Sequence, residues 1–594
     1  MTTPEWIVIG VTAATIALMF GTRLRPDLIA VMAALSLGLL GVIPDDAVLQ
    51  GLSSTVVVTL LGLFVLAEGL DNTGVIRWAA MRLSALGGTN EKRLLLTLMG
   101  AAAMLSLGMN NVAVGALFLP SALRIARSSG VRVSRLLLPV SYATLLGGMA
   151  TIFTSANIIM SDLLRQQGED PLKMLDFALT GGLVAVAGIA WMLLFGRRLL
   201  PSGERGDDAV YGDFFGLYEL GERFWEFEVS VRSRLAGRTI EDIGFGKEYG
   251  LSVLAIHRRH RTFLVPGPGI MVAPGDRVVV LGRLDRLRSL VDEGVGLRGG
   301  ASPEELQEEL ELTEVFVPPR SAASGRTLSE LGLRTRFGVT VLALWRGGEI
   351  IRTDVGKTPL ATGDGLLVVN IPQRVAALTR SGDFLAAAGS RLSAPEHPER
   401  APVAITIFAA VLIVALTGLL PTGETVLAGA VAMVLTGCMS MERAYRSVEW
   451  HVIFLVAGLL PLGFAMTDTG LADRVGELLG GLAATQSPML VIASMFLVST
   501  AATQVIGGQV SALLVGPIAL AVAAVAGIGL QPMAVAVAIG ASTAFLTPMA
   551  HPVNAMMMGT GGYRPIDYLR VGAGMTLVTL LAVLAGMWLF WGIR

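Results

Sequence analysis

Residues 94–123 read LLLTLMGAAAMLSLGMNNVAVGALFLPSAL, which is a pair of short apolar pieces separated by Asn110-Asn111. A helix needs about 20 apolar residues to cross the hydrocarbon core of a bilayer, so pieces of this length rarely span it alone. The segment is therefore predicted to be a re-entrant hairpin that enters the membrane and returns to the same side. An ordinary pair of helices joined by a tight loop is the alternative.

The same pattern returns near the other end of the chain, where residues 489–505 and 510–524 are separated by Gly507-Gly508-Gln509. Around the two hairpins, longer apolar runs form two flanks. These runs lie near residues 5–20, 26–43, 54–71, 136–160 and 175–196, and near 402–420, 425–440, 450–468, 532–550 and 571–592. The predicted fold is a polytopic α-helical membrane protein. It is an inverted repeat of five helices plus one re-entrant hairpin in each half, with a cytoplasmic α+β tandem insert.

The composition agrees with this class, since 53% of the residues are hydrophobic and only 15% are charged. Most of the charged residues fall between residues 200 and 400. The first apolar run lacks a basic leader and a cleavage site, so we interpret it as a retained helix. The net charge is −1 and there is no basic tract, so nucleic acid is not an expected partner. The single cysteine, Cys438, excludes an intramolecular disulfide.

Basic residues predict the orientation. They are frequent in some short loops, as at 124–135 and 197–198, and sparse in the others, which contain Arg165, Lys173 and Arg474. By the positive-inside rule, the basic side is cytoplasmic. The prediction is a multi-pass protein of the cell inner (cytoplasmic) membrane with a cytoplasmic insert and both termini outside.

The two flanks also resemble each other in sequence. Gly62 and residues 70–74 align with Gly458 and residues 466–470 at one offset, and Asn157 pairs with Asn554 at nearly the same offset. Inverted repeats with broken helices are typical of secondary transporters, whose sites lie near the bilayer midplane. There is no phosphate-binding loop, so an ion gradient is the expected driving force. An enzyme is not expected, because the sequence shows no catalytic triad or metal cluster.

The middle region is a second tandem repeat, in which Arg258 and Gly275-Asp276 recur as Arg346 and Gly363-Asp364. This pattern resembles the TrkA-C module, the C-terminal part of domains that regulate potassium conductance. The resemblance implies small β-α-β domains that dimerise and bind a small, nucleotide-like regulatory ligand. A dimerisation module without a ligand is the alternative. The predicted boundaries are 1–200 for the first membrane repeat, 201–295 and 296–400 for the two modules, and 401–594 for the second repeat.

Candidate binding residues lie at the hairpin tips and at breaks in the fourth run of each half. Irregular backbone at membrane depth is tolerated only where it lines a cavity, so these segments are candidates for a site. Pro548 and Pro552 should unwind the second break. The half-helix N-termini that follow the breaks favour anions. The predicted substrate-binding residues are Asn110, Asn111, Val112, Thr154, Ser155, Asn157, Gly507, Gly508, Gln509, Thr547, Pro548, His551 and Asn554.

Paired hairpins followed by a Thr-Ser-x-Asn segment at 154–157 and a Thr-Pro segment at 547–554 resemble the divalent anion:sodium symporter family of the ion transporter superfamily. The resemblance implies an elevator-type homodimer that moves sulfate or a small dicarboxylate with sodium. It places a first sodium ion at Ser106, Asn110 and Asn111. It places a second at Thr503, Ile506, Gly508 and Ala550. Two departures are the second tip, where side-chain oxygens are missing at Gly507 and Gly508, and Phe153, which replaces a glycine.

Three further polar residues lie in or beside the apolar runs. His551 matches Thr154 of the first half, and we interpret it as a proton carrier or an anion ligand, with a passive, hydrogen-bonded histidine as the alternative. Gln504 is predicted to brace its hairpin, and Glu68 is predicted to be interfacial. The sequence identifies neither the anion nor the choice between sodium and proton coupling. A sensor or channel that has lost transport, regulated by a small ligand, is the rival function.

Overall fold

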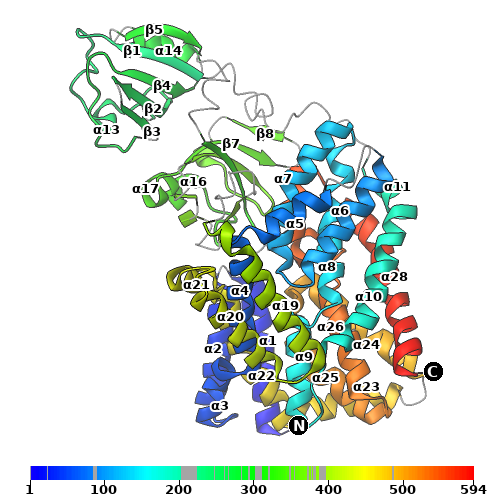
Figure 1. Ribbon diagram of the computed structural model, residues 1–594. Coiled ribbons are helices and arrows are strands. Elements are labelled where there is room, and N and C mark those ends of the chain that lie inside the picture. Colours follow the sequence, from blue (N-terminus) through cyan, green and yellow to red (C-terminus); the bar gives the residue numbers. More distant parts are fainter. Residues whose placement is uncertain are drawn as a thin grey trace. The chain divides into compact units, whose positions relative to one another are not determined.

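The computed structural model describes most of the chain, and Figure 1 shows its helices and strands. The described residues are 2–22, 24–84, 90–201, 224–246, 248–259, 261–264, 266–282, 284–291, 295–300, 311–318, 321–346, 349–352, 355–370, 374–375, 377–378, 383–386, 396–483 and 487–593. The chain divides into two compact units. One comprises Met1–Ser202 with Ser393–Arg594, and the other comprises Gly203–Leu392.

The first unit is helical throughout. Its first half contains α1 (Thr3–Gly21), α2 (Pro26–Leu39), α3 (Asp45–Gln50), α4 (Thr55–Asn72), α5 (Val75–Ser84), α6 (Glu91–Ser106), α7 (Asn111–Ser129), α8 (Leu137–Met149), α9 (Ser155–Gln166), α10 (Met174–Trp191) and α11 (Arg197–Leu199). Its second half contains α19 (Ala401–Thr417), α20 (Thr422–Leu435), α21 (Met441–Ser447), α22 (Trp450–Asp468), α23 (Leu471–Ala483), α24 (Pro488–Ile506), α25 (Gly508–Ala526), α26 (Leu530–Ser542), α27 (Pro552–Gly561) and α28 (Pro565–Trp591).

Seven helical segments of the described chain are long and apolar enough to cross a membrane, which makes the protein a polytopic membrane protein. They are Asp46–Asn72, Met174–Leu199, Pro398–Thr417, Trp450–Asp468, Pro488–Ile506, Gly508–Ala526 and Pro565–Trp591. Two of these are α24 and α25, which are each 19 residues long and therefore longer than the apolar pieces recognised in the sequence. Helix length is thus compatible with a re-entrant hairpin and also with an ordinary pair of helices joined by a tight loop. The structure also adds amphipathic helices after α4 and α22, namely α5 and α23, which the apolar runs did not predict.

The packing between helices repeats with the partners exchanged. Between the halves, α2 of the first half packs on α22 of the second, and α20 of the second half packs on α4 of the first. Within the halves, α6 packs on α8, and α24 packs on α26. The aligned glycines explain the first pair of contacts. A Cβ atom on Gly62 would lie 3.0 Å from the carbonyl carbon of Val426, and one on Gly458 would lie 2.6 Å from that of Ala30. Both glycines therefore permit the same close backbone approach in the two halves.

The second unit contains two antiparallel sheets, each with its own hydrophobic core. The first sheet has the order β3-β2-β4-β1-β5, and the second has the order β10-β6-β9-β7-β8. The strands of the first are β1 (Phe224–Val229), β2 (Ser252–Arg258), β3 (Arg261–Leu264), β4 (Arg277–Leu281) and β5 (Val295–Gly300), with α13 (Ile240–Ile243) and α14 (Leu284–Val291). Those of the second are β6 (Glu311–Phe316), β7 (Thr340–Arg346), β8 (Glu349–Ile351), β9 (Gly365–Asn370) and β10 (Leu385–Ala386), with α16 (Leu328–Leu331) and α17 (Leu333–Phe337).

One ion pair repeats between the two sheets. Arg258 Nη2 lies 2.7 Å from Asp276 Oδ2 in the first, and Arg346 Nη2 lies 2.6 Å from Asp364 Oδ2 in the second. In both, the arginine Nε also donates to the other carboxylate oxygen, which makes the pair bidentate. The strand β5 pairs with β1, so the first sheet continues to Gly300, beyond the module boundary predicted at residue 295.

Replacing residues 210–385 with a short flexible linker should leave a protein that still inserts into the membrane. The two sheet cores consist of residues of the second unit alone, so the deletion removes no residue from the helical unit. The measurement is the membrane fraction and the elution profile of the detergent-solubilised protein. Loss of insertion would contradict the boundaries. Of the polar linkers predicted at 201–208 and 393–400, residues 202–208 and 393–395 lie outside the described residues.

Candidate functional site

The first hairpin turns between α6 and α7, and both asparagines of its tip are engaged. Asn110 is the N-cap of α7, because its Oδ1 accepts the Val112 N–H at 2.9 Å. Its Nδ2 donates to Glu449 Oε1, 3.3 Å away at the start of α22. Ser106 Oγ donates to Asn111 Oδ1 at 2.5 Å. The structure thus brings Ser106 and Asn111 together, while Asn110 stabilises the helix start.

The first break, between α8 and α9, lies directly against this tip. A Cβ atom on Gly148 would lie 2.9 Å from Asn111 Oδ1 and 3.1 Å from Thr154 Oγ1. Thr154 is the N-cap residue of α9, but its hydroxyl donates to Gly148 O and makes no capping bond. We call Ser106, Asn111, Gly148 and Thr154 the first-half cluster. Its hydroxyl, amide and carbonyl oxygens are the ligand types that sodium and other hard cations take.

The tip of the second hairpin reaches the same break. Gln509, in the first turn of α25, donates through Nε2 to Ser155 Oγ at 3.3 Å. Ser155 is the first residue of α9. Three predicted site residues from separate elements, namely Asn111, Thr154 and Gln509, therefore meet around the N-terminus of α9.

The second half is built differently at the equivalent positions. The hydroxyl of Thr503 lies 2.9 Å from Ser499 O and 3.0 Å from Ala541 O, so it is already a donor. Gly508 packs so closely on α26 that a Cβ atom would lie 2.4 Å from Ala541 O.

Gln504 spans the space between α24 and the second break, as predicted for a brace. Its Nε2 donates to Thr500 O at 3.1 Å and to Thr543 O at 2.7 Å. Its Oε1 accepts the Leu546 N–H at 3.1 Å. These three bonds engage the whole side-chain amide and join the hairpin to both sides of the break.

The first predicted ion position fits the residues present, and the second does not. Ser106 and Asn111 offer side-chain oxygens beside the Gly148 carbonyl. In the second set, Ile506, Gly508 and Ala550 have no side-chain oxygen, and the hydroxyl of Thr503 is directed to backbone carbonyls. The second set therefore offers one side-chain oxygen, that of Thr503, whereas the first set offers those of Ser106, Asn110 and Asn111.

His551 is the N-cap of α27, because its Nδ1 accepts the Val553 N–H at 3.2 Å. It therefore occupies the same place at the second break as Thr154 does at the first. The contact requires an unprotonated Nδ1 atom. Thr547 and Pro548 lie in the irregular segment before it, and Thr547 Oγ1 lies 3.4 Å from Gln504 O.

Asn157 and Asn554 brace the breaks. Both are fully buried. Asn157 Nδ2 donates to Thr151 O at 2.6 Å, and Asn554 Nδ2 donates to Ala544 O at 2.6 Å. The remaining oxygens differ: Asn554 Oδ1 accepts from Ser141 Oγ at 2.6 Å, whereas Asn157 Oδ1 is buried without a hydrogen-bond partner.

Sequence reasoning missed the buried tyrosines that hold the second break. Tyr142 OH donates to Phe545 O at 2.7 Å, and Tyr568 OH donates to Asn554 O at 2.7 Å. It also missed Glu449, which only the fold brings to Asn110. A tyrosine within an otherwise apolar helix is a signal that could have identified Tyr142, because a buried hydroxyl needs a partner.

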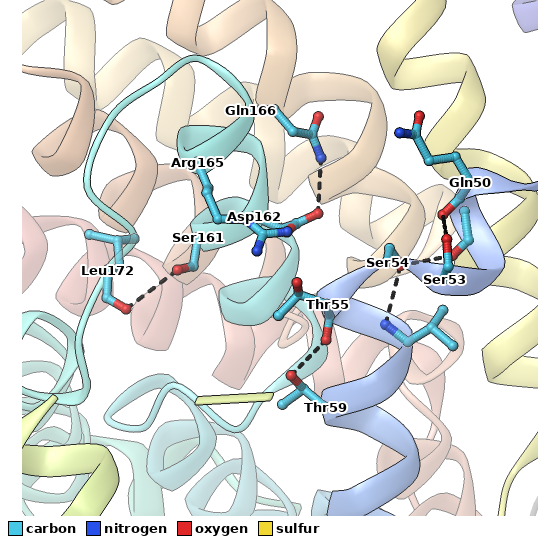
Figure 2. Close-up of polar contacts among 12 residues, drawn as sticks. Gln50, Ser53, Ser54, Thr55, Thr59, Ser161, Asp162, Arg165, Gln166 and Leu172 are labelled. Atoms are coloured by element: carbon cyan, nitrogen blue, oxygen red, sulfur yellow. Dashed lines mark hydrogen bonds and ion pairs between the residues drawn. The ribbon is translucent and has the colours of Figure 1, made fainter. Parts of the chain in front are cut away.

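A separate polar cluster lies where the C-terminal part of α9 faces the start of α4 (Figure 2). Asp162 is buried and accepts from Arg165 Nη2 at 2.8 Å and from Gln166 Nε2 at 2.9 Å. On α4, Ser54 caps the helix by accepting the Val57 N–H at 3.3 Å. All of these bonds join residues close in sequence, so they stabilise the ends of α9 and α4.

Several known proteins similar to this chain are named as transporters. The citrate transporter family CitMHS matches residues 15–540. An uncharacterized transporter of Synechocystis sp. is 31% identical over 582 residues, which cover 96% of this chain and 94% of the relative. The uncharacterized transporter YfbS of Escherichia coli is 28% identical, with 96% and 97% covered. Sodium/sulfate cotransporter 2 of Chlamydomonas reinhardtii is 26% identical over 349 residues, which cover 54% of this chain and 38% of that protein.

The match to CitMHS covers most of the chain, and the helices within it include the two hairpins and the first break. The relationship to membrane transporters expected from the sequence is thereby confirmed, while the resemblance of the insert to TrkA-C remains a prediction. The chain belongs to the CitMHS citrate transporter family of multi-pass membrane proteins.

Proposed function

We propose that this protein is a secondary active transporter of a small divalent anion such as sulfate or a dicarboxylate. The observation that carries the proposal is the meeting of both hairpin tips at the N-terminus of α9. The name of the algal sodium/sulfate relative supports this substrate class, and the citrate transporter family supports carboxylates within it.

In this proposal the anion binds at the start of α9. The N-cap side chain of α9 makes no capping bond, so its first turn presents backbone N–H groups at the positive end of the helix dipole. The Ser155 hydroxyl, the Asn111 amide and the Gln509 amide surround this end and supply uncharged donors. Because these donors are uncharged, they do not neutralise the charge of a bound anion. A co-transported cation would therefore be needed to balance that charge.

We propose sodium as that cation, bound by the first-half cluster beside the anion. The oxygens of Ser106, Asn111 and Thr154 suit a hard cation, and a cation at this place would reduce the charge of a bound dianion. The name of the sodium/sulfate relative agrees with this choice of ion.

Movement is proposed to follow an elevator mechanism in an inverted repeat. The exchange of partners between equivalent helix pairs supports the repeat. The hairpins and broken helices would carry the site, while the remaining helices would form the scaffold of a homodimer. The bond between Asn110 and Glu449 would then cross from the moving part to the scaffold.

The second unit is proposed to be a cytoplasmic regulatory insert. The repeated Arg–Asp pair and the repeated strand order support two copies of one module. A small, nucleotide-like ligand is the proposed regulator, and the positive-inside rule supports the cytoplasmic side.

Uptake into proteoliposomes tests the transport proposal. Radiolabelled sulfate, succinate and citrate would each be offered with an inward sodium gradient, an inward proton gradient or neither. Saturable accumulation above the external concentration, present only with a gradient, is the expected result for one of these anions. Flux that only equilibrates would instead indicate a channel, and the absence of flux for all three would reject the proposed substrate class.

His551 is expected to act as a helix cap in this cycle, with sodium as the coupling ion. Protonation of Nδ1 would abolish its bond to Val553 and add positive charge at the positive end of α27. We therefore expect His551→Asn, which keeps a capping acceptor, to transport with the wild-type pH profile. His551→Ala should lower the stability by about 1 kcal/mol. If uptake instead rises as the external pH falls and His551→Asn removes that rise, His551 carries a proton.

A further inference from the structure

The two halves differ at two paired positions that bear on coupling. At the offset that pairs Asn157 with Asn554, Leu107 is the counterpart of Gln504, and Asn111 is the counterpart of Gly508. The first half therefore has a side-chain oxygen at its hairpin tip and an apolar residue one turn before it. The second half has no side chain at the paired position, Gly508, and an amide one turn before it.

The amide of Gln504 makes the contacts that would otherwise be available to a cation. Its Nε2 group binds two backbone carbonyls, Thr500 O at 3.1 Å on the hairpin and Thr543 O at 2.7 Å on the break. Carbonyl oxygens that converge from two segments are ligands for a hard cation when no donor is present. Here two N–H groups of one neutral side chain satisfy both of them.

Further backbone carbonyls at the second break are also bonded by protein side chains. Tyr142 and Tyr568 hydroxyls bond the carbonyls of Phe545 and Asn554 on either side of the second break. At the paired offset Tyr142 corresponds to Ile539, and Ser141, which bonds Asn554, corresponds to Ala538. At the first break, by contrast, Asn157 Oδ1 is buried without a hydrogen-bond partner.

We propose that the side-chain amide of Gln504 takes the place of a coupling cation in the second half, so that the transporter binds sodium in its first half only. This inference deepens the proposed function and rests on its assignment of sodium to the first-half cluster. Removing the amide should uncover the carbonyl of Thr543, while Thr500 O loses its additional side-chain bond within α24. Ser542, adjacent to Thr543, has a buried Oγ without a hydrogen-bond partner and could serve as a further ligand.

Direct sodium binding tests this inference on the purified full-length protein. Bound radioactive sodium per chain would be counted at equilibrium, and the unfolding midpoint would be compared in sodium and choline chloride. Wild type should bind one sodium ion per chain, and Ser106→Ala should lose it. Gln504→Ala should bind one more ion than wild type. Gln504→Glu replaces the amide nitrogen by a carboxylate oxygen in a side chain of the same shape. This variant should bind the additional sodium ion more tightly than Gln504→Ala does.

The added ion should also raise the unfolding midpoint of Gln504→Glu. At sodium about 100-fold above its dissociation constant, the extra rise over wild type should be about 2–3 °C. Gln531 is the matched control, because its Nε2 also donates to a backbone carbonyl, Asp170 O at 3.3 Å, but on an exposed surface. Gln531→Ala and Gln531→Glu should bind as many ions as wild type.

Two results would overturn the inference. One is the binding of two sodium ions per chain by the wild-type protein. This measurement does not depend on the folding of any variant. The other is folded Gln504→Ala and Gln504→Glu proteins that bind no more sodium than wild type. If wild type binds none but Gln504→Glu gains one, the role of Gln504 stands, while the proposed sodium coupling through the first half is wrong.

Discussion

Asn111→Ala should weaken the apparent affinity for the transported anion about tenfold to a hundredfold. The side chain accepts the Ser106 hydroxyl at 2.5 Å and lies against Gly148 at the break. Its loss would leave these partners unsatisfied at a tip where water cannot freely replace it, which costs about 1–3 kcal/mol. The measurement is the dependence of the initial uptake rate on anion concentration in proteoliposomes.

Asn90→Ala is the matched control for this variant. Asn90 also lies at a helix start, where its Oδ1 accepts the Lys92 N–H at 3.0 Å, but its side chain is exposed. This change should leave the apparent affinity unaltered, because Asn90 caps α6 at the end remote from the tip. If Asn111→Ala transports with wild-type kinetics, the first hairpin tip is not part of the site.

Gly508→Ala should lower the stability of the folded protein by about 1–3 kcal/mol through overpacking and should reduce the initial transport rate by displacing the second tip. The added Cβ atom would lie 2.4 Å from Ala541 O, and a backbone carbonyl in a helix cannot easily yield. The tip must therefore move away from α26. Gln509, the next residue, would then lose its contact of 3.3 Å with Ser155 at the start of α9.

The rate would be normalised to the amount of folded protein in the liposomes, so that loss of insertion is not mistaken for loss of transport. Gly182→Ala is the control, because Gly182 lies within α10 and a Cβ atom there would meet nothing within 4 Å. That variant should transport as wild type. A Gly508→Ala protein with an unchanged rate would indicate that the second tip does not need its close contact with α26.

Much of the fold could be predicted from local patterns. Apolar runs of spanning length and the Asn, Gly and Pro residues that interrupt them are constrained by the bilayer, which requires backbone polar groups to be satisfied internally. The aligned Gly62 and Gly458 pointed to a repeat, and the structure gives both the same role in close helix packing. Helix α5 was not predicted, because only one of its faces is apolar and its run is short. The first sheet continues past residue 295 because β5 pairs with the distant β1, a pairing that no local pattern indicates.

The site was only partly predictable, since a polar side chain in a broken helix can face either a ligand or the backbone. Asn111, Thr154 and Gln509 were expected at the site, and the structure brings them to one helix start. Asn157 and Asn554 had the same local signature, yet their amides bond the carbonyls of their own breaks. Spacing in the sequence does not distinguish these cases, because the direction of each amide depends on what packs against it.

The amino-acid pattern alone identified a multi-pass membrane protein, and it predicted that the halves repeat and that hairpin tips and helix breaks carry the polar groups. Only the tertiary structure decided which of these groups remain available to a ligand. Gln504 illustrates the reason. Its partners Thr543 and Leu546 lie 39 and 42 residues further along the chain, beyond α25 and α26, and no local pattern states that its amide will meet them. A polar group buried in a membrane protein must find partners, and the fold determines whether those partners belong to the protein or to the cargo.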